Sequence, residues 1–286
     1  GHSDGLLVKA GSGLLTENVP DSAGVPKAFT DTTLIARYND LDSVRKLFEQ
    51  YEDKIAALIV EPVAANMGVV APEKGFLQGL RQLCDQYGAL LIFDEVITGF
   101  RLQLDGAVGH FGITPDMVTY GKIIGGGMPV GAYGGRREIM QLVAPLGSVY
   151  QAGTLSGNPV AMRAGLTQLR YLQAHPEVYH QVGFLSHRLR SGLEDIIRRH
   201  HAPCTVNGIG SLSCLYFTPE KVRNYADAKK ADTAKFREYF HFMLDRGNYF
   251  GPSQFEAIFV SNAHTLREID KTLGDADEFF AAHSGN

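Results

Sequence analysis

A carboxylate and an amine each stand at the end of a short apolar run, and together they suit one kind of chemistry. Asp94 follows the run Leu90–Phe93, and Lys122 closes a second run that begins at Asp116. Short continuous apolar runs are typical of strands buried on both faces of a parallel sheet, and ligands bind at the carboxyl ends of such strands. The pair suits a carbonyl cofactor with a basic ring nitrogen, because the carboxylate keeps that nitrogen protonated and the lysine forms a Schiff base.

Each of the two residues also has an ordinary structural interpretation. An aspartate at a strand end commonly caps a helix or forms a salt bridge, and a lone lysine is commonly solvated. The glycines around Lys122 favour the chemical interpretation. Gly121 precedes the lysine, and further glycines follow at positions 125, 126, 127, 131, 134 and 135. Glycine allows close backbone approach to a ligand and unusual dihedral angles, which a surface lysine does not need.

Composition limits the classes of function. The 286 residues are 44% hydrophobic, enough for a sizeable core in one large domain or two unequal ones. A net charge of −4 argues against nucleic acid as the main partner. No apolar stretch reaches the roughly 20 residues of a membrane span, and charged residues interrupt any signal peptide at the start. Three cysteines predict a reducing cytoplasm and no disulfide framework, and no metal site is predicted.

Hydrophobic periodicity predicts alternating strands and helices in the first part of the chain. The expected strands are 55–60, 90–93 and 116–122, and the expected helices are 41–51, 75–87, 137–143 and 159–173. Asn39-Asp40 and Asn158 are expected N-caps, with Pro159 at a first helical position. Strand, helix and strand joined by short links indicate right-handed βαβ units, and so an α/β fold with a mostly parallel central sheet flanked by helices.

The pattern changes after His175-Pro176. A long helix is expected to about residue 201, followed by strands 206–207, 212–217 and 257–261 and by helices 233–245 and 265–281. This mixture predicts a smaller α+β domain beside the larger one. The predicted domains are therefore 1–173 and 174–286.

Two irregular segments have open interpretations. Residues 1–29 are punctuated by Gly, Pro, Ser and Asn, and loops of this length are lids, binding loops or ordinary surface loops. The loop 150–158 carries hydroxyl groups and glycines just before an expected helix. Such a loop can bind phosphate at the helix start, although helix capping alone explains the same residues.

Four motifs, in order, resemble those of the class III pyridoxal-phosphate-dependent aminotransferases. They are Glu-Pro-Val-Ala-Ala-Asn-Met-Gly at 61–68, Phe-Asp-Glu-Val-Ile-Thr-Gly-Phe-Arg at 93–101, Gly-Lys-Ile-Ile-Gly-Gly-Gly-Met-Pro-Val-Gly-Ala at 121–132 and Gly-Thr-Leu-Ser-Gly-Asn-Pro at 153–159. Segments 2–13, 150–155 and 252–257 are similar to the aminomutase branch of that family. The likeness covers essentially the whole chain and implies the fold type I of pyridoxal-phosphate-dependent transferases.

The resemblance implies a set of residues around the cofactor pyridoxal 5'-phosphate, which alternates with pyridoxamine 5'-phosphate. Lys122 would carry the cofactor and move protons between carbon atoms of the substrate. Asp94 would pair with the pyridine nitrogen, Val96 would pack against the ring, and Asn66 would lie near the 3-hydroxyl group.

The same resemblance implies that two chains share each site. Thr154, next to Gly153, would reach the phosphate of the neighbouring subunit, which makes the protein a homodimer. Tyr150 and Glu256 would line the site, and the loop from Gly11 to Pro26 would form a lid.

The activity implied is conversion of a small amino aldehyde, glutamate 1-semialdehyde, to 5-aminolevulinate in tetrapyrrole biosynthesis. An amine is given to the aldehyde and recovered from the adjacent carbon, so a lid would retain the intermediate. The alternative is an ω-aminotransferase that exchanges its amine with a separate oxo-acid.

One departure from the family pattern matters for function. Members carry a long segment before the position that matches Gly1, and it supplies a ring-stacking aromatic, phosphate-binding amides and groups for the substrate carboxylate. We therefore expect this chain to be truncated relative to the family. A further alternative is a catalytically incompetent fragment that serves as a binding or assembly module.

Overall fold

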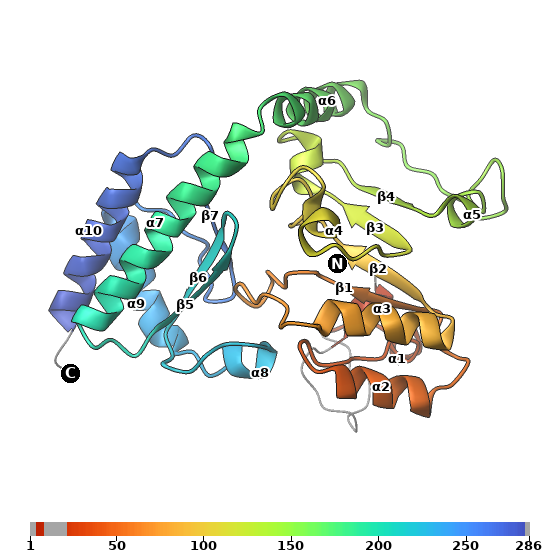
Figure 1. Cartoon of the computed structure of the whole chain (residues 1–286), viewed down its shortest axis with the longest axis horizontal. Helices are drawn as coiled ribbons and strands as arrows, with labels where there is room; N and C mark the ends of the chain where they lie inside the picture. The colour runs from red at the N-terminus through yellow and green to blue at the C-terminus, as the bar shows by residue number, and fades with distance from the viewer. Residues whose placement is uncertain (1–3, 9–21, 284–286) are drawn as a thin grey trace.

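Two β-sheets organise the computed structural model, which describes residues 4–8 and 22–283. The first sheet contains, in spatial order, β1 (Ala57–Val60), β2 (Leu90–Asp94), β3 (Met117–Tyr120) and β4 (Ala132–Gly135). The second contains β5 (Thr205–Ile209), β6 (Leu212–Tyr216) and β7 (Ile258–Phe259), all antiparallel. Figure 1 shows the two sheets in separate halves of the molecule, with α6 above the first.

Helices cover both sheets. Those of the first half are η1 (Asp4–Leu6), α1 (Lys27–Thr30), α2 (Leu41–Gln50), α3 (Phe76–Tyr87), α4 (Gly106–Phe111), η2 (Lys122–Gly125), α5 (Arg137–Met140) and α6 (Pro159–Ala174), where η marks a 3₁₀ turn. Those of the second half are α7 (Glu177–Arg199), α8 (Tyr225–Ala228), α9 (Thr233–Asp245) and α10 (Leu266–His283). The long helices α7 and α10 lie side by side over the second sheet (Figure 1).

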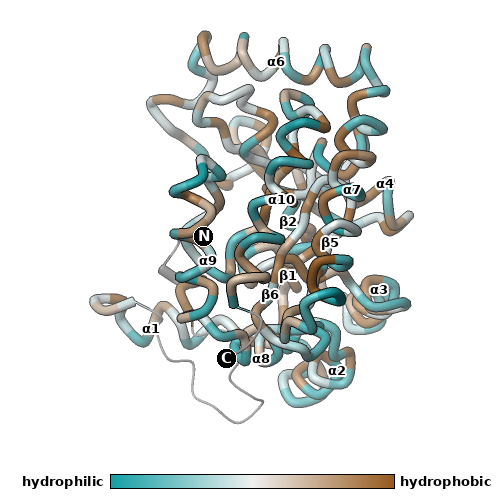
Figure 2. Tube along the Cα trace, turned by 90° about the vertical axis from the view of Figure 1, so that its left-hand side faces the viewer, coloured by the Kyte–Doolittle hydropathy of each residue, from teal (hydrophilic) through white to brown (hydrophobic). Residues whose placement is uncertain are grey.

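The helices against the first sheet form where their sequence signals predict. Asp40 caps α2 by accepting a hydrogen bond from the backbone N–H of Ser43 at 2.9 Å, and α3 ends at Gly88 in the left-handed region, with φ 66°. Both helices alternate hydrophilic and hydrophobic residues along their turns (Figure 2). Their apolar sides bury one cluster against β2, made of residues such as Val44, Phe48, Leu80, Leu91 and Phe93. This packing fixes the strand that carries Asp94.

The first sheet is mostly parallel, as predicted. β1 pairs with β2 and β2 with β3 in parallel register, with Val60 opposite Phe93 and Asp94 opposite Thr119. β4 then runs antiparallel to β3, a strand that the sequence analysis did not predict. β1 forms the other edge and has no second neighbour among the described strands.

Most predicted elements are present, with several corrections. The strand expected at 257–261 is reduced to the two residues of β7, because only Leu212 and Ser213 pair with it. The helix expected at 137–143 stops at Met140, and the short helices α1, α4 and α8 were not expected. Of the predicted lid, Gly11 to Pro26, residues 11–21 lie outside the described residues.

The two halves meet at a buried turn, residues 62–70. Tyr216 of β6, which is fully buried, donates from its hydroxyl group to the carbonyl oxygen of Met67 at 2.8 Å. The backbone N–H of Gly68 donates to the carbonyl oxygen of Phe255 at 2.7 Å. Within the described ranges, none of the helices has the length and apolar character needed to cross a membrane.

Candidate active site

The carboxyl ends of β1, β2 and β3 place three ionisable residues at one edge of the sheet. Glu61 follows the last residue of β1, Asp94 ends β2, and Lys122 lies two residues after β3. Because neighbouring strands lie about 5 Å apart, the register places Glu61 beside Asp94. This edge, called here the Asp94 edge, thus carries one carboxylate more than the predicted pair of Asp94 and Lys122. The carboxylate of Glu95, the next residue after β2, is buried and accepts hydrogen bonds from Thr98, Ala107 and Val108.

Asp94 is half-buried and is held by its own turn. Its Oδ1 accepts a hydrogen bond from the backbone N–H of Val96 at 3.0 Å and one from the Thr119 hydroxyl at 3.4 Å. Its Oδ2 has no hydrogen-bond partner in the part of the chain that the structure describes. The carboxylate is thus fixed in direction and retains one oxygen that can accept a proton donor from a ligand.

Lys122 begins η2 in an unusual backbone conformation. Its φ is +48°, which residues other than glycine seldom adopt and which is concentrated at functional sites. The side chain is exposed, and no hydrogen bond or ion pair to its amine occurs within the described ranges. Gly121 packs against Val96, where an added Cβ would lie 3.2 Å from Val96 Cγ1. The strained lysine therefore sits next to the side chain predicted to contact the cofactor ring.

Glu61 is a site residue that the sequence analysis missed. Its Oε1 accepts a hydrogen bond from Asn66 Nδ2 at 2.6 Å, and its Oε2 accepts one from the backbone N–H of Ala65 at 2.7 Å. Burial raises the pKa of Glu61, and the negative charge of Asp94 adds to this, whereas the two hydrogen bonds and the positive charge of Lys122 oppose it. A carboxylate at a strand end was the signal already used for Asp94, and it applied equally to Glu61.

The glycines after Lys122 serve helix packing. Gly126 lies in the left-handed region, and a Cβ there would come 2.7 Å from the carbonyl oxygen of Ala164 in α6. A Cβ at Gly165 would come 2.1 Å from the carbonyl oxygen of Ile124. The unusual dihedrals were predicted. At these positions the structure shows a close backbone approach between η2 and α6. The helix α6 therefore supports the turn that begins with Lys122, called here the lysine turn.

The predicted phosphate-binding loop makes no hydrogen bond to Asp94, Glu61 or Lys122 among the described residues; its Gln151 accepts one from the Tyr133 hydroxyl of β4 at 3.4 Å. Gly153 and Thr154 are exposed, and Tyr150 is 83% exposed. The segment leaves α5 and returns to α6 outside both sheets (Figure 1). Its helix end has the predicted cap, because Asn158 Oδ1 accepts hydrogen bonds from the N–H groups of Val160 and Ala161 at 3.1 and 3.2 Å.

Glu256 comes from the second half of the molecule. It is exposed and follows Phe255, whose carbonyl oxygen holds Gly68, two residues after Asn66. The structure thus brings the Glu256 segment to the turn that carries Asn66. No hydrogen bond from the Glu256 side chain to the Asp94 edge occurs among the described residues.

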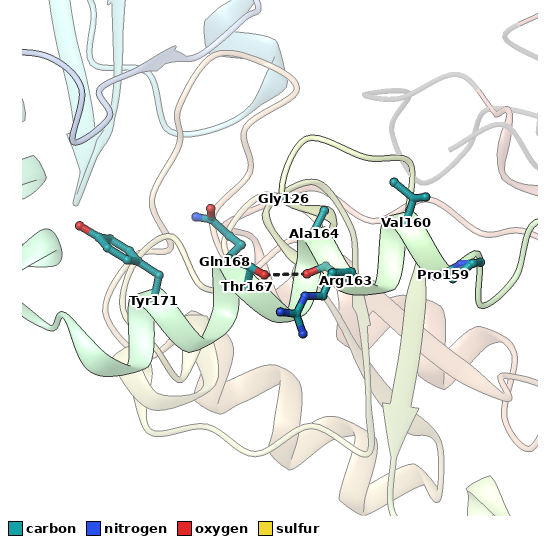
Figure 3. A pocket seen from close by; sticks show the side chains of 8 residues that line it. All are labelled: Gly126, Pro159, Val160, Arg163, Ala164, Thr167, Gln168 and Tyr171. Atoms are coloured by element: carbon teal, nitrogen blue, oxygen red, sulfur yellow. Dashed lines mark hydrogen bonds between the residues drawn. The ribbon is translucent and has the colours of Figure 1, made fainter.

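A separate hollow runs along the outer side of α6. Its lining comes almost wholly from that helix, with Gly126 of the lysine turn behind it (Figure 3). Val160 and Tyr171 are exposed at its two ends. Most of its lining residues are exposed, and none of them is Asp94, Glu61 or Lys122.

Comparison with known proteins agrees with this geometry. Residues 1–273 match the family described as aminotransferase class-III. The chain is 61% identical over 273 residues to glutamate-1-semialdehyde 2,1-aminomutase 2 of Lachnoclostridium phytofermentans, covering 96% of the chain and 64% of that relative. The chain thus spans a little under two thirds of the relative's length.

Solved structures show the same fold. An omega-transaminase from Sphaerobacter thermophilus aligns with a TM-score of 0.87 at 30% identity, over 98% of this chain and 66% of that one. A variant of a glutamate-1-semialdehyde-aminomutase from Pseudomonas aeruginosa, in complex with PMP, aligns with a TM-score of 0.82 at 26% identity, over 98% and 63%. The molecule is an α/β protein with the fold of the pyridoxal-phosphate-dependent transaminases. The chain belongs to the class III aminotransferase family.

Proposed function

We propose that the chain forms the catalytic region of a glutamate-1-semialdehyde 2,1-aminomutase, which converts glutamate 1-semialdehyde to 5-aminolevulinate. The observation that carries the proposal is the convergence of Asp94, Lys122 and the Glu61–Asn66 pair at one carboxyl edge of a parallel sheet. The name of the relative at 61% identity supports this particular reaction. The Pseudomonas structure with PMP supports pyridoxal and pyridoxamine 5'-phosphate as the cofactor.

The residues at this edge fit such a cofactor. Asp94 has one oxygen free to hold a proton on the ring nitrogen, and Val96 offers an apolar surface beside it. When bound, the cofactor supplies a conjugated ring that takes up negative charge from the carbon that loses a proton. Lys122 has an amine without a protein partner in the described ranges, so its Nζ can accept a proton from one substrate carbon and return it to the next.

The loop 150–157 supports a homodimer with shared sites. Thr154 and Gly153 are exposed, as they would be before a second copy covers them and they serve its phosphate. Apolar side chains next to them are also uncovered, since Leu146 is 79% exposed and Leu155 is 73% exposed. In the homodimer, this loop and the α6 hollow (Figure 3) are covered by the partner. Tyr150 and Glu256 then line the site for the amino aldehyde.

The proposal includes the cellular compartment of the protein and its division into two domains. The three cysteine thiols are buried and unpaired, and burial raises the pKa of Cys84 to about 11. Such thiols remain neutral and suit the reducing cytoplasm. Residues 1–173 form the cofactor-binding domain and residues 174–286 the smaller domain in this proposal.

Cofactor trapping followed by a turnover assay tests the function. Purified chain is incubated with pyridoxal 5'-phosphate and reduced with borohydride, and peptide mass spectrometry should find the cofactor fixed to Lys122, with Lys122→Ala as the control. Glutamate 1-semialdehyde should then be converted without any added amino acceptor.

Two results would contradict the proposal. A strict need for a separate oxo-acid would identify an ω-aminotransferase, the alternative that the Sphaerobacter omega-transaminase supports. A folded chain that retains no cofactor at Lys122 would be an incompetent binding or assembly module.

A further inference from the structure

Asn66 is the one exposed residue in an otherwise buried turn. Residues 62–65 and 67–70 are all buried, and Ala64 pairs with Val70 across the turn. The Asn66 side chain is therefore the only side chain that this turn offers to solvent or to a ligand. What fixes its direction decides what the turn can recognise.

Glu61 fixes the Asn66 amide by hydrogen-bond chemistry. An ionised carboxylate only accepts hydrogen bonds, so the nitrogen end of the amide must face Glu61 Oε1, 2.6 Å away. The amide oxygen, Oδ1, then points elsewhere and has no hydrogen-bond partner in the described part of the chain. Glu61 Oε2 is taken by the N–H of Ala65 at 2.7 Å, so the carboxylate cannot rotate without breaking a second bond.

We propose that Glu61 is a positioning residue, which holds the Asn66 amide so that its free oxygen and second N–H face an oxygen substituent of the bound ligand. The inference rests on the proposed function for the identity of that ligand as the cofactor ring. Its structural part, the dependence of Asn66 on Glu61, concerns the free protein.

The turn does not depend on Glu61 for its backbone path. Tyr216 holds Met67, Phe255 holds Gly68, and Asn207 Nδ2 donates to the carbonyl oxygen of Val69 at 3.0 Å. These three contacts come from the second half of the molecule. Replacing Glu61 should therefore release the Asn66 side chain while leaving the buried turn in place.

The charges around Glu61 make the arrangement dependent on pH. Asp94, Lys122 and Tyr38 are the ionisable groups that interact with it, and the Tyr38 hydroxyl itself donates to the carbonyl oxygen of Pro62 at 2.9 Å. Burial, with the charge of Asp94, raises the pKa of Glu61. Protonation turns one oxygen into a donor, so the carboxyl group can no longer accept equally well from both Asn66 and Ala65, and its hydrogen bond to Asn66 should weaken as the pH falls through that raised value.

Nuclear magnetic resonance of the cofactor-free chain tests the structural part. The chain is labelled with ¹⁵N-asparagine, and Asn66→Asp identifies the side-chain amide signals of Asn66. One amide proton should resonate well downfield of those of exposed asparagines, and the pair should shift with acid titration. In Glu61→Leu, which has no acceptor, the downfield signal and its titration should both disappear, whereas Tyr216→Phe should preserve them. Ordinary Asn66 shifts in the parent, or unchanged shifts in Glu61→Leu, would overturn the proposal.

Cofactor affinity tests the ligand part by a double-mutant cycle. Glu61→Leu should weaken binding of pyridoxal 5'-phosphate about tenfold, the equivalent of one hydrogen bond worth ~1.4 kcal/mol. In an Asn66→Ala background the same change should have little further effect, because the two residues act through one contact. If the losses of cofactor affinity in the two single variants add up in the double variant, Glu61 has a merely structural role. If the parent chain binds no cofactor, the proposed function fails, and the resonance experiment alone decides the role of Glu61.

Discussion

Gly165 of α6 lies directly against the backbone carbonyl of Ile124, in the turn that begins with Lys122. A Cβ at Gly165 would come within 2.1 Å of that oxygen, a distance that no real contact has. The helix and the lysine turn thus meet without a side chain between them. The position of the reactive amine depends on this backbone contact.

The first prediction concerns that contact. Gly165→Ala should destabilise the chain by about 1–3 kcal/mol, as overpacking does, and should displace the Lys122 turn. Gly183→Ala in α7 is the matched control, because a Cβ there meets nothing within 4 Å. The control should be neutral or stabilising by up to about 1 kcal/mol, since alanine favours helix interiors. Urea unfolding measures both, and equal stability of the two variants would contradict the prediction.

The second prediction concerns Asp94. Asp94→Asn keeps an oxygen that can accept from Val96 and Thr119, so the fold should persist. Without the charge, proton removal from the substrate should slow about 100-fold or more, because such a partner contributes on the order of 3 kcal/mol in a dry site. Loss of deuterium from labelled substrate measures this step. Thr119→Val keeps the charge and should react at nearly the parent rate; unchanged rates in Asp94→Asn would refute the assignment.

The third prediction is the acid sensitivity caused by Asp116, a buried residue immediately before β3. Its carboxylate accepts hydrogen bonds from Arg81 and from the N–H of Leu91, both at 2.7 Å, and from Arg136 at 2.8 Å. Burial acts to raise the pKa of Asp116, but these hydrogen bonds and charges outweigh it and hold the pKa below its usual value. The stabilisation is therefore complete above the unfolded pKa of about 3.9 and is lost as the pH falls through the lower, folded value.

Asp116→Asn isolates that effect. The free energy of unfolding of the variant should be about 3 kcal/mol lower than that of the parent near neutral pH, because the change leaves two arginines without their shared anion. The difference in free energy of unfolding between parent and variant should stay constant down to about pH 4. It should then shrink as Asp116 of the parent is protonated. Denaturant titrations at several pH values give the two curves. If that difference in free energy of unfolding does not shrink in acid, the charge of the Asp116 carboxylate contributes nothing to stability.

The fourth prediction tests Thr154 across the proposed interface. Thr154→Val should lose cofactor affinity, and Lys122→Ala should be inactive. In a mixed dimer, the subunit with the intact Lys122 receives a normal Thr154 from its partner, so one site in each mixed dimer should regain full affinity. Differently tagged chains allow the mixed dimer to be isolated and titrated. If isolated mixed dimers regain nothing, Thr154 acts only within its own chain.

Local signals account for most of the fold. Asp40 and Asn158 cap their helices as predicted, and the limits of α9 match the predicted 233–245, because caps and apolar periodicity act over a few neighbouring residues. β4 could not be predicted in the same way. Its Ala-Tyr-Gly-Gly sequence has little strand preference, and it becomes a strand through pairing with β3, a contact that is not local.

The candidate site was predictable in part. Asp94 and Lys122 follow buried strands, and the parallel order brings their strand ends to one edge. The contact between Glu61 and Asn66 depends on the path of the turn between them, which apolar periodicity does not describe. The roles of Thr154, Gly153 and Tyr150 stay predictions, because a second copy of the chain has to supply the other side of that contact.

The open side of β1 has a consequence for handling the chain. Along this edge a row of backbone N–H and C=O groups has no strand partner among the described strands, and Ile59 is 46% exposed beside it. Such a row is a template on which a strand of another molecule can add. We therefore expect aggregation in a concentrated preparation to start at β1. Ile59→Lys, which puts a charge on that strand, should raise the concentration at which the protein remains in solution.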